Sequence, residues 1–129
     1  YAELLAESDP ATALEYVNKV HRRAYGCSPD SPSEYDYRSL SDRTKAFFDN
    51  DPLATNPLRY ERWAELFAEG QWWLDVRRWR IGSEEADYYI ETSHGPITWK
   101  GDCSYVQPIP QLELERNHNM HQSEGYAGI

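Results

Sequence analysis

The sequence predicts an all-α protein with one small irregular β-hairpin and extended loops. Two stretches, 11–25 and 57–80, repeat apolar side chains three and four residues apart, which is the spacing of one helix face. Each stretch has a capping residue and a proline at its start, a combination typical of helix starts. A chain of 129 residues suits one domain and needs no metal or disulfide to fold.

The first two predicted helices are adjacent. Residues 1–7 look like the last turns of a helix, so we expect the chain to be a piece of a larger protein. Asp9 is a good N-cap for the helix over 11–25, Pro10 fits its first position, and Gly26 signals its end. The break between the two segments predicts an antiparallel helix pair.

The next region, 27–57, is rich in turn residues, and we expect in it one short helix over 41–49. Ser41 would cap this helix, and Phe47 or Phe48 would be buried.

The longest predicted helix covers about 57–80, with Asn56 as its cap. One face carries Trp63, Phe67 and Trp73, which we expect in the core, whereas Trp72 and Trp79 lie off this face. Gly70 is unfavourable inside a helix, so we expect another backbone to approach closely there.

Residues 82–104 lose the helical period and predict a hairpin or loop region. Tyr88-Tyr89-Ile90-Glu91 and Ile97-Thr98-Trp99 resemble short strands around the turn residues His94-Gly95-Pro96. The tail over 105–129 is expected to be extended because of its prolines, with one short helical turn at 111–116.

Composition excludes some classes of partner. The net charge is −9, so the chain is a poor ligand for nucleic acid or an anionic lipid surface. No run approaches 18 apolar residues, so no segment predicts a membrane span. The chain has 5 Trp and 10 Tyr but only 3 Phe. This excess favours partly solvent-exposed surfaces and binding faces, because Trp and Tyr combine an apolar ring with a polar group.

The sequence contains no catalytic, cofactor or metal motif. Cys27 and Cys103 match no metal or redox spacing, and they are either one disulfide or two unrelated thiols. His118 and His121 lie among Asn and Gln rather than further metal ligands, and His21 is expected to be packed or partnered. Phosphate loops and nucleophile elbows are absent. The acidic clusters fit a solvated surface, while a glycosidase pair would need a set separation that sequence does not give; these residues are Glu84, Glu85, Asp87, Glu113 and Glu115.

Aromatic residues in predicted loops are the candidate ligand contacts. Flat rings stack on the C–H faces of sugars, while hydroxyl groups bond at the rim. The alternative is that these rings pack within their own domain. The candidates are Tyr35, Tyr37, Tyr88, Tyr89 and Trp99.

Three segments in order resemble the C-terminal part of the SusD/RagB family. They are residues 13–24 (ALEYVNKVHRRA), 61–79 (ERWAELFAEGQWWLDVRRW) and 105–126 (YVQPIPQLELERNHNMHQSEGY). The chain departs from the family pattern at His21 and Trp72, where arginine is usual, at His118, where proline is usual, and at Ser123 and Glu124, which replace Asn-Pro.

The resemblance implies a TPR-like helical fold and a binding protein rather than an enzyme. Such a protein captures glycans, or sometimes peptides, at the outer face of an outer membrane, where a lipid anchor outside these residues would hold it. Its partner would be a TonB-dependent transporter of the SusC type. The matched charged residues would form a structural network around the long helix, and they are Arg62, Glu65, Glu69, Asp75 and Arg78.

The leading hypothesis is therefore glycan capture for import. One rival is a helical scaffold that docks a protein and binds no sugar, and burial of Trp72 and Trp79 against a partner would favour it. A second rival is a glycoside hydrolase, which a convergent pair of carboxylates in an open cleft would favour.

Overall fold

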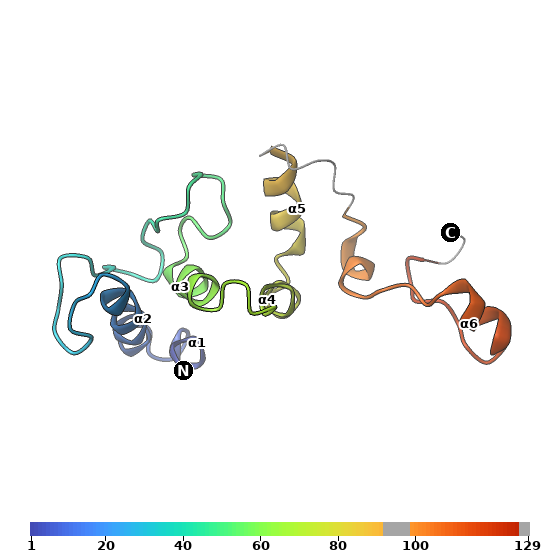
Figure 1. Ribbon diagram of the computed structural model, residues 1–129, viewed down its shortest axis with the longest axis horizontal. Helices are drawn as coiled ribbons and strands as arrows, with labels where there is room; N and C mark the ends of the chain where they lie inside the picture. The colour runs from blue at the N-terminus through green and yellow to red at the C-terminus, as the bar shows by residue number, and fades with distance from the viewer. Residues whose placement is uncertain (92–98, 127–129) are drawn as a thin grey trace. The chain divides into compact units, whose positions relative to one another are not determined.

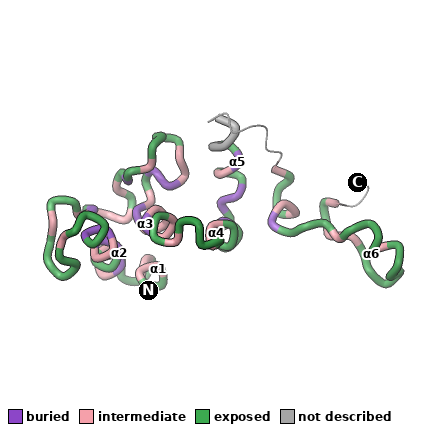
Figure 2. The backbone as a smooth tube through the Cα atoms, viewed as in Figure 1, coloured by how far each residue is buried: buried purple, intermediate pink, exposed green. Residues whose placement is uncertain are grey.

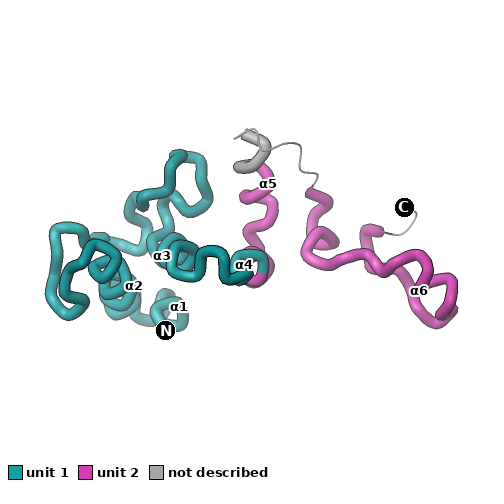
Figure 3. The backbone as a smooth tube through the Cα atoms, viewed as in Figure 1, with its two compact units in different colours: residues 1–73 teal, residues 74–129 magenta. Residues whose placement is uncertain are grey.

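A computed structural model describes residues 1–91 and 99–126, apart from the side chains of 88–91. These residues form helices and no strand, so the predicted all-α fold is confirmed (Figure 1). The chain divides into two compact units, residues 1–73 and 74–129 (Figure 3). The helices, in chain order, are α1 (Ala2–Leu5), α2 (Pro10–Ala24), α3 (Pro57–Glu65), α4 (Trp72–Trp79), α5 (Gly82–Glu91), the 3-10 helix η1 (Gly101–Tyr105) and α6 (Gln111–Arg116).

Both ends of α2 are closed as its sequence predicts. The Thr12 N–H donates to the Asp9 carboxylate at 3.1 Å, and Pro10 occupies the first turn. At the other end Gly26 has φ +69°, its N–H donates to the Arg23 carbonyl at 3.0 Å, and the Cys27 N–H donates to the Arg22 carbonyl at 2.9 Å. This pair of bonds is a Schellman motif, so the predicted cap and stop signals are confirmed.

The predicted single helix over 57–80 is wrong, because α3 ends at Glu65 and α4 begins at Trp72. Between them Ala68 and Gly70 have φ +64° and +74°, which no helix accommodates. A Cβ built on Gly70 would meet no atom within 4 Å. The expected close approach of another backbone is therefore also wrong, and the left-handed conformation explains the glycine.

This break changes which aromatic side chains are buried. Phe67 is 68% exposed and Trp73 is 46% exposed. The prediction that these two residues lie in the core is therefore wrong. Trp63 is half-buried and contacts Phe67 edge to face, with ring centroids 5.6 Å apart. Residues that share a face of one continuous helix lose that alignment when the helix stops between them.

Residues 41–49 form turns and bends rather than the expected helix, and Phe47 is 87% exposed. Thr44 closes the loop, since its N–H donates to the Ala54 carbonyl and its hydroxyl donates to the Leu53 carbonyl, each at 2.8 Å. The Arg43 guanidinium donates to the backbone carbonyls of Thr44, Ala46 and Ala54. Such local side-chain bonds offer the backbone an alternative to helix.

The core of unit 1 lies where α1 and α3 pack on α2 and where the loop between α2 and α3 folds back on them (Figure 2). Its apolar part is small and includes Ala13, Val17, Leu53 and Ala54. The same region buries polar side chains, which are Asn18, His21, Arg22, Thr44 and Glu61.

Unit 2 places a helix where the sequence predicted the first strand of a hairpin. Tyr88 to Glu91 form the last turn of α5, so that strand is wrong, while the predicted turn and residues 97–98 lie outside the described residues. Acidic residues in the first turn favour this helix, because they lie near its positive end. α5 packs on η1, and the Gly82 N–H donates to the Tyr105 hydroxyl at 2.9 Å.

The tail contains α6, which covers the predicted helical turn at 111–116. Gln122 returns to Ile109, accepting its N–H at 2.8 Å and donating to its carbonyl at 2.9 Å. Within the described part of the chain, no helix has both the length and the apolar character needed to cross a bilayer.

Candidate functional site

A row of rings in unit 1 runs from the surface to the interior. Tyr35 and Tyr25 stack with centroids 4.3 Å apart and planes 12° apart, and Tyr25 contacts His21 at 4.9 Å. His21 contacts Tyr37 at 4.2 Å. The first pair is 43% and 40% exposed, whereas His21 and Tyr37 are buried. The exposed tyrosine pair therefore rests on a fixed interior.

The buried end of this row is held by hydrogen bonds. The Tyr37 hydroxyl donates to Glu61 Oε1 at 2.8 Å, and His21 Nδ1 lies 2.7 Å from the same oxygen. Asn18 holds the Tyr37 backbone, accepting its N–H at 2.9 Å and donating to its carbonyl at 3.0 Å. Burial, and then the bond to Glu61, raises the pKa of Tyr37 well above its usual range. The prediction that His21 is packed and partnered is confirmed.

A second buried group, Arg22, uses all five of its N–H donors. Two of them bond the Asp36 carboxylate at 2.7 and 2.6 Å, two bond the Glu15 carboxylate at 2.8 and 3.0 Å, and one bonds the Pro29 carbonyl at 2.9 Å. The hydrogen bonds that Arg22 donates to Asp36 and Glu15 raise the pKa of Arg22, and the bond from Arg22 lowers the pKa of Asp36. This planar fork ties α2 to the loop that follows it.

Beside these buried groups lies a hollow of about 340 Å³, here called the tyrosine hollow. Its volume falls within the range of small-ligand sites, roughly 300–1,000 Å³. Stacked rings and charged side chains line the same space, and both are features that bind polar ligands with flat apolar faces. The lining residues are His21, Tyr25, Glu34, Tyr35, Asp36, Tyr37, Arg38, Asp42, Arg43 and Lys45.

The structure brings together two of the five predicted ligand-contact residues. Tyr35 and Tyr37 both line the tyrosine hollow, although Tyr37 is buried and Tyr35 is exposed. Trp99, Tyr88 and Tyr89 belong to unit 2, and the side chains of Tyr88 and Tyr89 lie outside the described residues.

Sequence reasoning missed Tyr25, which is the stacking partner of Tyr35. Its position gave a usable signal, because it follows the last residue of α2 and precedes the glycine that ends the helix. A ring at that position leaves the helix face and is free to meet the next loop.

Trp99 packs within unit 2. Its ring meets Tyr105 edge to face with centroids 4.8 Å apart, and a Cβ on Gly82 would lie 2.1 Å from its Cη2 atom. Arg80 lies over the Tyr105 ring at 4.3 Å and pairs with Asp102 at 2.7 Å. Trp99 is half-buried by these contacts.

The five residues of the expected charge network fall in both units. In unit 1 Glu65 pairs with Arg23 of α2, Arg62 is half-buried, and Glu69 is exposed. In unit 2 the buried Asp75 pairs with Arg78, one turn further along α4, at 2.8 Å. These contacts are ion pairs between or within helices.

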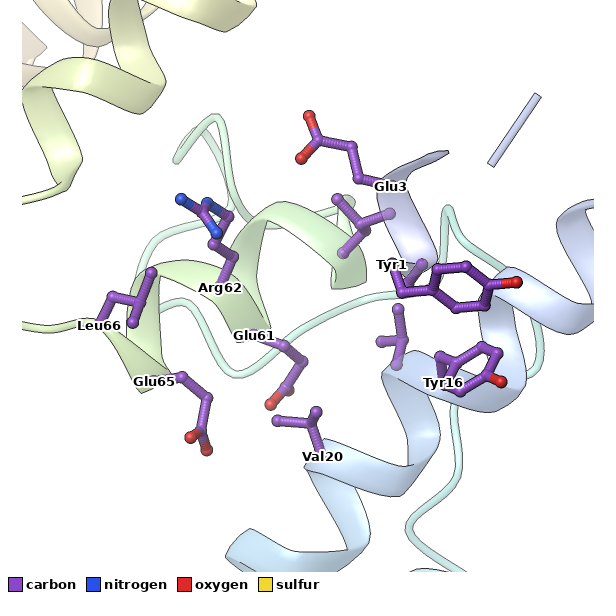
Figure 4. A pocket seen from close by; sticks show the side chains of 11 residues that line it. Tyr1, Glu3, Tyr16, Val20, Glu61, Arg62, Glu65 and Leu66 are labelled. Atoms are coloured by element: carbon purple, nitrogen blue, oxygen red, sulfur yellow. The ribbon is translucent and has the colours of Figure 1, made fainter. Parts of the chain in front are cut away.

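A second hollow of about 340 Å³ in unit 1 lies between α1, α2 and α3 (Figure 4). Tyr1 and Tyr16 meet there edge to face at 5.0 Å, and Glu61 and Glu65 extend from α3 (Figure 4). The remaining lining is largely aliphatic, with Val17, Val20 and Leu66. Because this space presents no exposed stacked pair, the tyrosine hollow is the better candidate site.

Both cysteines are free thiols, which is the second of the two alternatives that the sequence left open. The Ser33 hydroxyl lies 3.6 Å from Cys27 Sγ, and Cys103 Sγ lies 3.1 Å from the Lys100 carbonyl.

The comparisons with known proteins agree with the resemblance seen in the sequence. A family model described as the SusD family matches residues 1–126, so the chain belongs to this family. No curated protein and no solved structure matches the chain. Membership of the family implies a nutrient-binding protein of the cell surface.

Proposed function

We propose that this protein captures glycans at the outer face of an outer membrane and delivers them to a TonB-dependent transporter of the SusC type. The observation that carries the proposal is the family match over residues 1–126. In this role the protein is a lipid-anchored binding protein and performs no catalysis.

The tyrosine hollow supplies a place for sugar contact. The Tyr25–Tyr35 stack offers an exposed aromatic surface, and the charged rim offers hydrogen-bonding groups around it. Each ring contributes about 1 kcal/mol, so binding by this hollow alone would be weak. Tyr37 would act by holding the row of rings, and Trp99, Tyr88 and Tyr89 remain further proposed contacts in unit 2.

Isothermal titration of the protein with a polysaccharide panel tests this proposal. The panel contains amylopectin, arabinoxylan, polygalacturonan, hyaluronan and the methyl esters of the last two, with a tryptic digest of casein as the peptide arm. Binding of at least one polysaccharide is expected. If only the peptides bind, or if nothing binds, glycan capture is refuted.

A protein-docking scaffold is the second candidate, because exposed apolar rings support it. Phe47 and Phe67 are 87% and 68% exposed, and both lie in unit 1. A protein that binds no polysaccharide of the panel, together with a Phe67→Ser variant that loses co-purification with a SusC-type transporter, would support docking. Unchanged co-purification would remove Phe67 from a docking surface.

A further inference from the structure

We propose that the tyrosine hollow selects glycans that carry carboxylate groups, with Arg38 and Lys45 as the side chains that recognise the charge. This inference rests on the proposed function and names its ligand class. The inference comes from the charged side chains of the hollow. Some of them already form hydrogen bonds or ion pairs within the described part of the protein, and others do not.

Two acids of the hollow are engaged within the protein. Asp36 receives two N–H bonds from Arg22, which also lowers its pKa, so it stays ionised and paired. Asp42 accepts the backbone N–H groups of Arg38 and Ser39, the latter at 3.2 Å. Both carboxylates therefore already accept hydrogen bonds within the protein, and the charge of Asp36 is also balanced by the Arg22 guanidinium.

Of the three Arg and Lys side chains that line the hollow, one is engaged within the described part of the protein and two are not. Arg43 is occupied by three backbone carbonyls and by Asp49 at 2.9 Å. Arg38 and Lys45 are exposed, and among the described residues their side chains form no hydrogen bond, ion pair or ring contact. Two cations thus remain available at the rim of a hollow in a chain whose net charge is −9.

Glu34 is the exposed acid that opposes them. Its side chain also has no partner within the described part of the chain. Among the described residues, the charged side chains of the hollow without a partner are therefore two cations that donate hydrogen bonds and one carboxylate that accepts them. They offer more unused donors to an anionic ligand than unused acceptors to a cationic one.

The chemistry of these groups fits a sugar acid. A guanidinium donates two parallel N–H bonds to a carboxylate, and an ammonium adds a point charge with three donors. The Tyr25–Tyr35 stack provides the surface for the C–H face of the same sugar. A neutral sugar would use the rings and leave both cations without a charged partner.

The experiment compares acidic polymers with their uncharged forms. Polygalacturonan and hyaluronan are each titrated beside their methyl esters, because esterification removes the charge and leaves the sugar backbone. In at least one pair the acid form is expected to bind ten times more tightly than its ester. Raising NaCl from 50 to 500 mM should reduce that preference, because salt screens exposed charges.

Three variants locate the effect. Arg38→Gln combined with Lys45→Gln should lower affinity for the acid form about tenfold and leave the ester unchanged. Lys100→Gln combined with Arg116→Gln removes the same charge from unit 2 and should change neither. Glu34→Gln should raise affinity for the acid form by a factor of two to five. Since these side chains are exposed, the midpoint of urea unfolding should not move.

Several outcomes would overturn the inference. Equal affinity for each acid and its ester would show that the hollow does not distinguish charged from uncharged glycans. Unchanged affinity of the Arg38 and Lys45 variant for the acid form would show the same. If neutral polysaccharides bind and acidic ones do not, this inference fails while the proposed function stands. If no polysaccharide binds, the proposed function itself fails.

Discussion

Two neighbouring clusters in unit 1 differ in whether their charged side chains are buried and hydrogen-bonded or exposed and without partners among the described residues. In the interior, Arg22 and Glu61 are buried, and each is held by several hydrogen bonds from α2 and the following loop. At the rim of the tyrosine hollow, Tyr35, Arg38 and Lys45 are exposed, and both cations lack partners within the described part of the chain. A buried charge without partners carries a large free-energy cost, whereas an exposed charge is solvated by water and costs little without a protein partner. We therefore expect the first cluster to stabilise the fold, and we propose the second as the surface that recognises the ligand.

Removing Arg22 should have the largest effect on stability. Arg22→Met removes four bonds to the Asp36 and Glu15 carboxylates and one to the Pro29 carbonyl. Glu15 is half exposed and can rehydrate, so we expect a loss of about 3 kcal/mol in the free energy of unfolding, measured with urea. Arg22→Lys keeps the charge but not the planar fork, and it should also destabilise. A loss under about 0.5 kcal/mol would place Arg22 among ordinary surface residues.

Tyr35 and Tyr37, which both line the tyrosine hollow, should differ in a matched pair of variants. Tyr37→Phe removes a bond to a buried carboxylate and should cost about 2 kcal/mol of unfolding free energy. Tyr35→Phe keeps the stacked ring at an exposed position and should change stability by less than about 0.5 kcal/mol. Equal effects in the two variants would contradict the division between the clusters.

The buried cluster should also give stability a dependence on pH at both extremes. The pKa of Asp36 is lowered, so its contribution is complete above its unfolded pKa of about 3.9 and is lost as pH falls through the folded value. The pKa of Tyr37 is raised, so its contribution is present below about pH 10 and is lost as pH rises further. Urea unfolding across this range should show both losses.

Variants assign each end of that profile. Asp36→Asn should flatten the acid side, and Tyr37→Phe should flatten the alkaline side, with Tyr35→Phe as the control for the latter. An alkaline side that Tyr37→Phe leaves unaltered would mean that another tyrosine causes it.

The exposed ion pair between Arg23 and Glu65 should matter least. The side chains are 66% and 36% exposed, so solvent screens their attraction. Arg23→Gln is expected to change the free energy of unfolding by less than about 0.5 kcal/mol. A larger loss would indicate that the charges matched to the family pattern hold helices together more strongly than their exposure suggests.

Local sequence signals predicted the elements whose causes are local. The caps at Asp9 and Asn56 and the stop at Gly26 rest on bonds to backbone groups within a few residues, and each is present. The break between α3 and α4 was missed because apolar spacing continues through Ala68 and Gly70, although both adopt left-handed conformations. The side chains at 88–90 favour strands, so the sequence predicted a strand where the last turn of α5 lies.

The candidate site was only partly predictable for a physical reason. Tyr35 and Tyr37 look alike in the sequence, and what separates them is contact with residues far along the chain. Glu61 lies 24 positions from Tyr37 and 40 from His21, and no local pattern specifies that they meet. The family resemblance supplied the class of function, while the pairing of charges in the hollow needed coordinates.

Replacement of Tyr35 by alanine tests the division between recognition and stability most directly. Titration with the polysaccharide that binds best should show affinity reduced by roughly tenfold, because one member of the stacked pair is lost. Urea unfolding of the same variant should show a loss of about 1 kcal/mol or less. Unchanged affinity, or a collapse of stability as large as that of Arg22→Met, would show that the exposed rings serve the fold and that sugars bind elsewhere.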